Sequence, residues 1–179
     1  CRNVSKALLE IYERKHALHA YEILKPYCAK TFISNREDQK DAEGFRGLPQ
    51  IHDKKIYQGI GPLGGILSAM TLYPQASWLI MACDLPFVTQ ETVDELIKNR
   101  DCQKIATTFK STHDGLPEPL CAIWEGKGYS NIFDSFKKSI HCPRKVLINS
   151  DIQLLKQKNE RWLDNVNDPK EFEQAKILL

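Results

Sequence analysis

Short apolar runs alternate with amphipathic stretches along the chain, and this pattern predicts an α/β fold with a mostly parallel sheet. The run from 78 to 83 is continuously apolar, as expected for a strand that is covered on both faces. Further strands are predicted at 31–34, 105–109 and 120–124. Helices between such strands would build a three-layer αβα, Rossmann-like domain.

Amphipathic segments predict helices at 16–24, 66–72, 89–99, 130–140 and from 168 to about 177. Thr89 can cap the third of these helices, and Asp168 can cap the last. The first clear strand follows a helix, whereas a doubly wound sheet normally opens with a strand. We therefore expect an N-terminal strand to be missing or poorly signalled.

Composition fits one globular domain over residues 1–179, with 42% hydrophobic and 27% charged residues. The net charge of +2 is too small to indicate a nucleic-acid partner. The longest apolar run is far shorter than the about 20 residues of a membrane helix, and no signal peptide is visible. No membrane association is therefore expected.

Six cysteines occur without metal-ligand spacing, at positions 1, 28, 83, 102, 121 and 142. No C-x-x-C pair is present, and no two cysteines lie close enough in sequence to a histidine to indicate a zinc site. This usage favours a reduced, cytoplasmic location. The five histidines are scattered and no G-x-S-x-G elbow occurs, so hydrolytic triad chemistry is not expected.

The most informative position is Asp84, which follows the apolar strand and precedes Pro86 and a capped helix. In open α/β sheets, ligands bind at the carboxyl ends of the strands. A carboxylate there can hold Mg²⁺, which favours one or two carboxylates together with substrate phosphates. The alternative is that Asp84 only caps or solvates the end of the strand.

Three other segments are candidates for ligand contact. The glycines of 59–65 precede a helix, and the backbone amides at the start of a helix favour phosphate binding. The alternative is that these glycines only allow a tight loop to form. The two prolines of 115–120 stiffen the entry to a strand, with or without a substrate role. Asn165 and Asn167 can bind the edge of a heterocycle or simply build a turn.

Taken together, four segments resemble motifs of the molybdenum cofactor guanylyltransferase family of nucleotidyltransferases. Residues 61–66 resemble its G-P-L-x-G segment, and 82–87 resemble its C-D-x-P segment. Residues 117–122 resemble P-E-P-L-x-A, and 165–169 resemble N-V-N-T-P. Their order and spacing agree with the family over nearly the whole chain.

The resemblance implies transfer of GMP from GTP to molybdopterin, with Mg²⁺ as cofactor and release of pyrophosphate. It implies that Asp84 holds the metal and that Lys6 and Asp84 are catalytic. The nucleotide would contact Lys6, Asp53, Gly61, Gly65 and Asp84. Asn165 and Asn167 would face the pterin. GTP and molybdopterin are then the small-molecule partners, and other cofactor-biosynthesis proteins are compatible with this function.

The family opens with a strand and a Gly-rich loop that cradles the triphosphate, and no glycine precedes Gly44 in this sequence. Ser5 also stands where the family has Asp. We therefore expect the strand and loop to be missing from residues 1–179. Three alternatives stay open: a transferase that uses CTP or another acceptor, a non-catalytic binding module without the triphosphate loop, and an unrelated flavodoxin-like domain.

Overall fold

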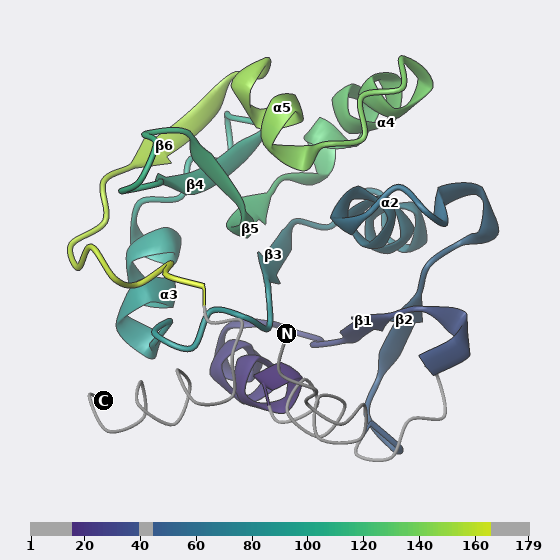
Figure 1. Cartoon of the computed structure of the whole chain (residues 1–179), viewed down its shortest axis with the longest axis horizontal. Helices are drawn as coiled ribbons and strands as arrows, with labels where there is room; N and C mark the ends of the chain where they lie inside the picture. The colour runs from purple at the N-terminus through teal and green to yellow at the C-terminus, as the bar shows by residue number, and fades with distance from the viewer. Residues whose placement is uncertain (1–15, 40–44, 166–179) are drawn as a thin grey trace, which may run out of the picture.

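The computed structural model describes residues 16–39 and 45–165, which form two sheets with helices on both sides (Figure 1). The smaller sheet pairs β1 (Ile33–Asn35) with β2 (Gln50–His52) in parallel. The larger sheet has the order β3-β5-β4-β6. Its strands are β3 (Trp78–Met81), β4 (Ala106–Lys110), β5 (Pro117–Trp124) and β6 (Ile152–Leu155).

Strand β5 runs antiparallel to both of its neighbours, β3 and β4, whereas β6 runs parallel to β4. The other three strands of this sheet therefore share one direction. The α/β prediction is confirmed, with a mixed sheet in which β5 is the reversed strand. A hairpin-like return through 111–116 allows this reversal, because antiparallel neighbours need no helical crossover.

Four named helices surround the sheets, and residues 16–24 form a further helical segment. The helices are α2 (Pro62–Leu72), α3 (Gln90–Lys98), α4 (Tyr129–Lys137) and α5 (Pro143–Ile148). Short 3-10 turns lie at Lys25–Tyr27, Glu37–Gln39, Lys55–Tyr57 and Gly126–Gly128. The helix predicted from 168 onward falls outside the described residues.

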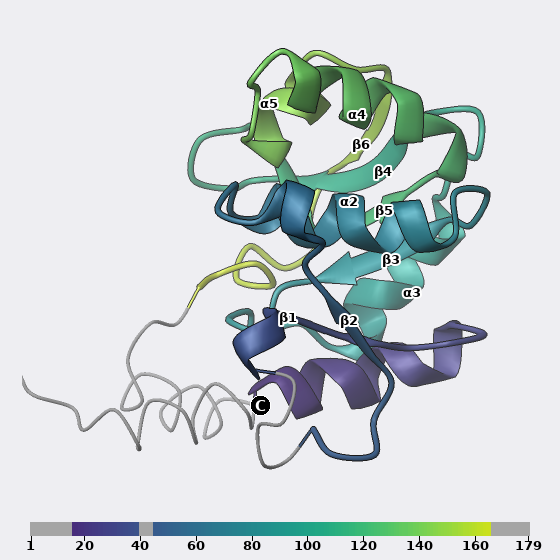
Figure 2. The ribbon, with the colours of Figure 1, turned by 90° about the vertical axis from the view of Figure 1, so that its right-hand side faces the viewer.

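Two hydrophobic cores lie on opposite faces of the larger sheet, and β5 contributes alternate residues to each. Ala122 and Trp124 pack with buried residues of α2, α4 and α5. Cys121 and Ile123 pack with α3 and with Trp162, on the other face. This alternation follows from the two-residue period of a strand, and in Figure 2 α2 lies on the near side of the sheet and α3 on its far side.

Strand β3 differs from its sequence-based prediction. We expected it to be covered on both faces, but each of its four residues is only half-buried. The physical reason is its position, because β3 is an edge strand that pairs with β5 alone among the described strands. In the parts of the chain that the structure describes, no helix is long and apolar enough to cross a membrane.

Candidate functional site

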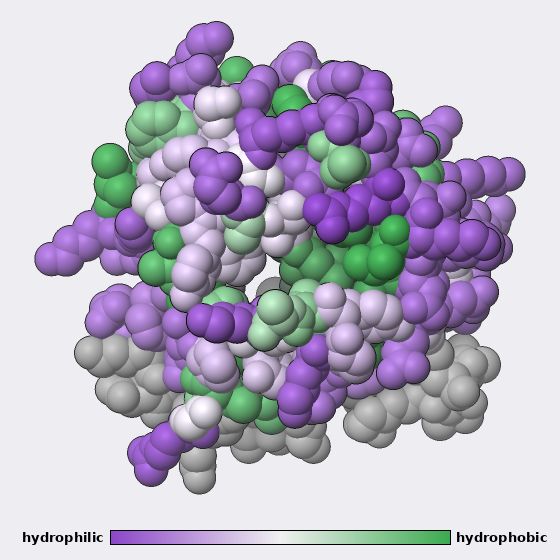
Figure 3. All heavy atoms as spheres, turned by 180° about the vertical axis from the view of Figure 1, so that it is seen from behind, coloured by the Kyte–Doolittle hydropathy of each residue, from purple (hydrophilic) through white to green (hydrophobic). Residues whose placement is uncertain are grey.

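A cavity of about 1350 Å³ separates the two sheets and is lined by residues of both β1 and β3. Figure 3 shows the molecule hollowed near its centre, beside hydrophobic residues. Four residues selected from the sequence line this one cavity: Asp53, Gly61, Gly65 and Asp84. The fold thus brings together segments that lie up to 31 residues apart in the sequence, between Asp53 and Asp84.

Asp84 reaches the cavity from the turn that follows β3, and its side chain is half-buried. The turn is held from both sides. Leu85 is buried in the core beside α3, and Nδ1 of His16 lies 3.0 Å from the carbonyl oxygen of Cys83. Helix α3 then begins with a reciprocal capping box between Thr89 and Thr92. These contacts fix the place of the carboxylate at the end of the strand.

The glycine turn that precedes α2 has two distinct structural requirements. Gly61 has a φ of +67°, a conformation that glycine adopts without steric cost, and Pro62 then opens the helix. Gly64 lies against the carbonyl oxygen of Tyr57, where a Cβ atom would collide with the backbone. Part of this glycine pattern therefore serves packing.

Gly65 faces the cavity instead. A Cβ atom at this position would lie 2.8 Å from Oγ of Ser34 and 3.7 Å from Oδ1 of Asp53. The absence of a side chain here keeps open the space between α2 and the ends of β1 and β2. It also lets a ligand in the cavity approach the backbone of the first turn of α2.

Asp53 follows β2 and is half-buried at the cavity wall. Burial raises the pKa of its carboxyl group above the ordinary value, and the positive charges of Arg36 and His52 oppose this effect. A partly desolvated carboxylate is a strong acceptor for the N–H groups of a ligand. Asp53 is therefore suited to ligand recognition by charge and by position.

Asn35 was missed by the sequence reasoning, although it ends β1 and lines the same cavity. Its Nδ2 donates to Oε1 of Gln50 at 2.8 Å, and its Oδ1 lies 2.7 Å from Nδ1 of His52. The available signal was the same as for Asp84, a polar residue directly after an apolar strand. The short prediction of 31–34 stopped one residue too early to reveal it.

Residues 2–147 match the family model described as the MobA-like NTP transferase domain. The chain belongs to this family. The nucleotidyltransferase class expected from the four motifs is thereby confirmed.

Two curated relatives illustrate the similarity. The chain is 30% identical over 167 residues to a "probable molybdenum cofactor guanylyltransferase" of Bacillus cereus, covering 88% of this chain and 80% of that protein. It is 32% identical over 169 residues to the "molybdenum cofactor biosynthesis bifunctional protein" of Synechocystis, covering 94% of this chain. The chain spans about half the length of that second relative (48%).

Two solved structures share the fold at 19% sequence identity. A protein from Aquifex aeolicus VF5 has a TM-score of 0.76, with 94% of this chain and 88% of that chain covered. The "molybdopterin-guanine dinucleotide biosynthesis protein A" from Archaeoglobus fulgidus has a TM-score of 0.70, with coverage of 93% and 84%. The Rossmann-like three-layer prediction is confirmed.

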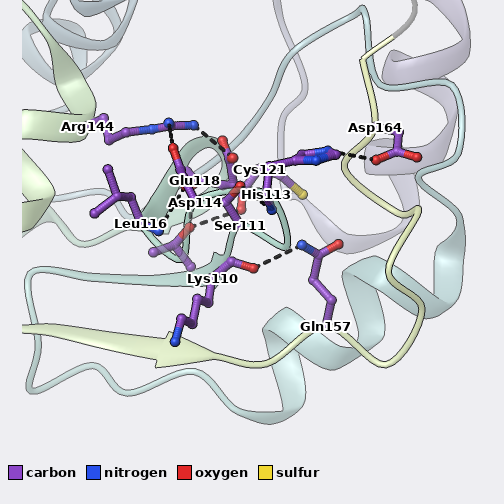
Figure 4. A network of polar contacts seen from close by, with 11 residues as sticks. Lys110, Ser111, His113, Asp114, Leu116, Glu118, Cys121, Arg144, Gln157 and Asp164 are labelled. Carbon is purple, nitrogen blue, oxygen red and sulfur yellow. Dashed lines mark hydrogen bonds and ion pairs between the residues drawn. The ribbon is translucent and has the colours of Figure 1, made fainter.

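Within this MobA-like chain, the P-E-P-L segment has a structural part in a polar network (Figure 4). Arg144 of α5 donates to Oε1 of Glu118 at 2.8 Å and to Oδ2 of Asp114 at 2.9 Å. Asp114 also accepts a hydrogen bond of 3.0 Å from the backbone N–H of Leu116. Arg144 thus ties the start of β5 to the loop that precedes it.

The loop 111–116 also contacts the segment that leads to Asn165. Nε2 of His113 lies 3.1 Å from Oδ1 of Asp164, and Thr112 donates to the carbonyl oxygen of Glu160. Gln157 donates to the carbonyl oxygen of Lys110 at 2.9 Å (Figure 4). This loop therefore positions residues 157–165 relative to the sheet.

Three predicted site residues remain: Lys6, Asn165 and Asn167. Asn165 is exposed and is not part of the cavity wall. Lys6 and Asn167 lie outside the described residues. Across 16–39 and 45–165, no three His, Cys, Asp or Glu side chains group together to hold a metal ion by themselves.

Proposed function

We propose that this protein transfers GMP from GTP to the terminal phosphate of molybdopterin and releases pyrophosphate. The observation that carries the proposal is the convergence of Asp53, Gly61, Gly65 and Asp84 on one cavity. The MobA-like family membership supports the nucleotidyl transfer. The relatives named as molybdenum cofactor guanylyltransferases support GTP as donor and molybdopterin as acceptor.

In this reaction, a phosphate oxygen of the acceptor attacks the α-phosphorus of GTP. The bond from that phosphorus to the bridging oxygen of the β-phosphate breaks, and pyrophosphate leaves with the electron pair. Both reactants carry negative charge, so positioning and charge neutralisation supply most of the catalysis. We assign the nucleotide side to the cavity and the pterin side to Asn165 and Asn167, with Lys6 as a further phosphate contact.

The donor set at the cavity fits a magnesium ion that arrives with the nucleotide. Asp84 offers one half-buried carboxylate at the cavity wall, and Mg²⁺ commonly binds one or two protein carboxylates together with phosphate oxygens. We propose Asp84 as the protein ligand of this ion. When bound, Mg²⁺ would neutralise charge on the phosphates as pyrophosphate departs.

Gly61 and Gly65 would allow the nucleotide to lie against the first turn of α2, where backbone N–H groups point toward an anion. Asp53 would accept hydrogen bonds from the nucleoside, helped by its partly desolvated carboxylate. A cytoplasmic setting is part of the proposal, and it is supported by the free thiols of Cys28, Cys102, Cys121 and Cys142.

The test is a pyrophosphate-release assay with GTP, Mg²⁺ and molybdopterin on the full-length protein. We expect Asp84→Asn to lower the rate at least about 100-fold, because one charge-stabilising group of this kind contributes ~3 kcal/mol. Asp134→Asn is the matched control, since Asp134 is exposed on α4, where it pairs with Lys137. An equal rate for Asp84→Asn would contradict the metal assignment.

Substitution of CTP for GTP in the same assay tests the base. If CTP raised the melting temperature more than GTP and was turned over faster, the proposed activity would be cytidylyl transfer and not guanylyl transfer. Binding of GTP without any turnover would instead support a non-catalytic module. The proposed function requires both GTP binding and pyrophosphate release.

A further inference from the structure

The turn that carries Asp84 is built from its own backbone and from two apolar anchors. Val88 donates its N–H to the carbonyl oxygen of Leu85 at 3.3 Å, and both side chains are buried in the core beside α3. Within 16–39 and 45–165, no hydrogen bond or ion pair holds the carboxylate of Asp84 itself. The position of this carboxylate therefore depends on what holds the turn.

Phe87, three residues after Asp84, joins this turn to a charged side chain far away in the sequence. Cζ of Arg161 lies 4.4 Å from the centroid of the Phe87 ring. This is well within the about 6 Å at which a guanidinium is attracted to an aromatic face. The ring is half-buried, and partial removal of water strengthens such a cation–π contact.

The Arg161 side chain is also held on its other side. Its Nε lies 3.7 Å from Oδ2 of Asp164, and Oδ1 of Asp164 lies 3.1 Å from Nε2 of His113. Figure 4 shows His113 and Asp164 directed toward one another. The guanidinium is thus placed between the Phe87 ring and a carboxylate that contacts the loop 111–116.

The segment that carries Arg161 is anchored to the sheet independently of this residue. The side chain of Gln157 is buried and donates to the carbonyl oxygen of Lys110 at 2.9 Å. Trp162 is buried against Phe109, with ring centroids 5.7 Å apart. Arg161 itself is 53% exposed, so its removal leaves both of these anchors in place.

The contact between Arg161 and Phe87 joins the two halves of the proposed active site. Arg161 lies four residues before Asn165, which the proposed function assigns to the pterin, and Phe87 follows the proposed metal ligand Asp84. Reacting groups on the two sides must be held accurately, because a displacement of about 1 Å can lower the rate about 100-fold. A contact that links the two segments can therefore affect the reaction without touching a substrate.

We propose that Arg161 is a positioning residue of the transferase. Its guanidinium holds the ring of Phe87, and through this ring it fixes the Asp84 turn relative to the segment that leads to Asn165. The inference rests on the proposed function. Arg161 acts through Phe87 and makes no contact with GTP or molybdopterin.

Steady-state kinetics of the full-length protein test this role. We expect Arg161→Ala and Phe87→Leu each to lower kcat at least about tenfold and to raise the Mg²⁺ concentration that gives the half-maximal rate. The KM for GTP should stay within about threefold, because Asp84 and the other nucleotide contacts are still present. The melting temperature should change little, because the buried anchors of the segment remain.

Two further variants show whether the ring contact is responsible. Arg161→Lys keeps a cation that can lie over the ring, so its kcat should exceed that of Arg161→Ala at least about threefold. The double variant Phe87→Leu/Arg161→Ala should be no slower than either single variant, because both changes remove the same contact. Losses that multiply would instead show that Arg161 acts on the substrates directly, which would overturn the inference.

Lys158→Ala is the matched control. It breaks another contact of the same segment, the ion pair with Glu95 of α3, without changing Arg161 or Phe87. Because an ion pair of this kind at the surface contributes little, kcat should stay close to that of the wild type. A loss as large as that of Arg161→Ala would show that any weakening of the segment lowers the rate, and would contradict a specific role of Arg161.

A measurement without substrates separates this inference from the proposed function. Exchange of the Val88 amide hydrogen reports opening of the turn, and it should be at least about tenfold faster in Arg161→Ala and Phe87→Leu than in the wild type and Lys158→Ala. Unchanged exchange in Arg161→Ala would overturn the inference even if the wild type transfers GMP. If exchange responded as expected but the wild type released no pyrophosphate, the proposed function would fail and the effect of Arg161 on the turn would stand.

Discussion

The backbone N–H of Asp53 donates a hydrogen bond of 3.2 Å to the carbonyl oxygen of Asn35, and this bond joins the ends of β2 and β1. It fixes the backbone of Asp53 beside the cavity while its carboxylate faces the open side of Gly65, where a Cβ atom would lie 3.7 Å from Oδ1. One wall of the cavity is thus formed by the ends of β1 and β2, Gly65 and the carboxylate of Asp53.

Asp53→Asn should raise stability at neutral pH and weaken nucleotide binding. Burial raises the pKa of Asp53, so the folded state disfavours its ionised form. The resulting penalty is absent below the unfolded pKa of about 4 and develops as the pH rises through the folded pKa. The melting temperature of Asp53→Asn should exceed that of the wild type at pH 7 and should match it near pH 3.

Gly64→Ala and Gly65→Ala should separate folding from binding. The new Cβ of Gly64→Ala would collide with the carbonyl oxygen of Tyr57, which should destabilise the fold by about 1–3 kcal/mol. In Gly65→Ala the collision is with the exposed hydroxyl of Ser34, which can rotate away. Urea unfolding should show a change within about 1 kcal/mol for Gly65→Ala, whereas calorimetry should show weaker GTP binding.

Arg100→Ala should destabilise the fold through the buried carboxylate of Glu125. Nε and Nη2 of Arg100 donate to both carboxylate oxygens, at 2.7 and 2.8 Å. Burial by itself would raise the pKa of Glu125, but Arg100 and Ser77 outweigh it and lower the pKa below its ordinary value. Because the Arg100 side chain is 38% exposed, we expect a loss of about 1–3 kcal/mol.

The stabilisation by Glu125 is present above its unfolded pKa and is lost as the pH falls through the lower folded value. The difference between Arg100→Ala and the wild type in urea unfolding should therefore shrink below about pH 4. Lys104→Ala is the control, since its partner Asp151 is 73% exposed and an ion pair that is screened by solvent contributes little to stability. If Lys104→Ala lowered the free energy of unfolding as much as Arg100→Ala, the result would contradict this account.

Thiol labelling should distinguish the cysteines by burial. Burial raises the pKa of Cys121 to about 12, so its reactive thiolate form is scarce in the folded protein. Cys102 and Cys142 are exposed and should react with a maleimide within minutes. Mass spectrometry should find Cys121 labelled only after denaturation, and rapid labelling in the native protein would contradict its placement in the core.

The sequence was most informative where a strand or helix boundary coincided with unusual residues. Asp84 after the apolar run and the Gly-Pro turn before α2 both line the cavity, because strand ends and helix starts face the same side of an α/β sheet. The predicted helix at 66–72 proved to begin at Pro62, since Gly61 and Pro62 are themselves the start of the helix.

Non-local pairing explains what was not predicted. β2 and β6 are short and were not recognised, because their stability comes from pairing with β1 and β4 and not from their own pattern. The reversed direction of β5 is likewise set by its partners. Periodicity could not show that β3 lies at an edge, since an apolar run looks the same whether or not a neighbouring strand is present.

The central claim is that the cavity between the two sheets binds the nucleotide through Asp84. Calorimetric titration of the protein with GTP, in the presence of Mg²⁺, tests this claim most directly. The account predicts heat of binding for the full-length wild type and for Asp134→Asn, and affinity at least about tenfold lower for Asp84→Asn, a loss of ~1.4 kcal/mol. Equal affinity in all three proteins would contradict the assignment of the cavity as the nucleotide site.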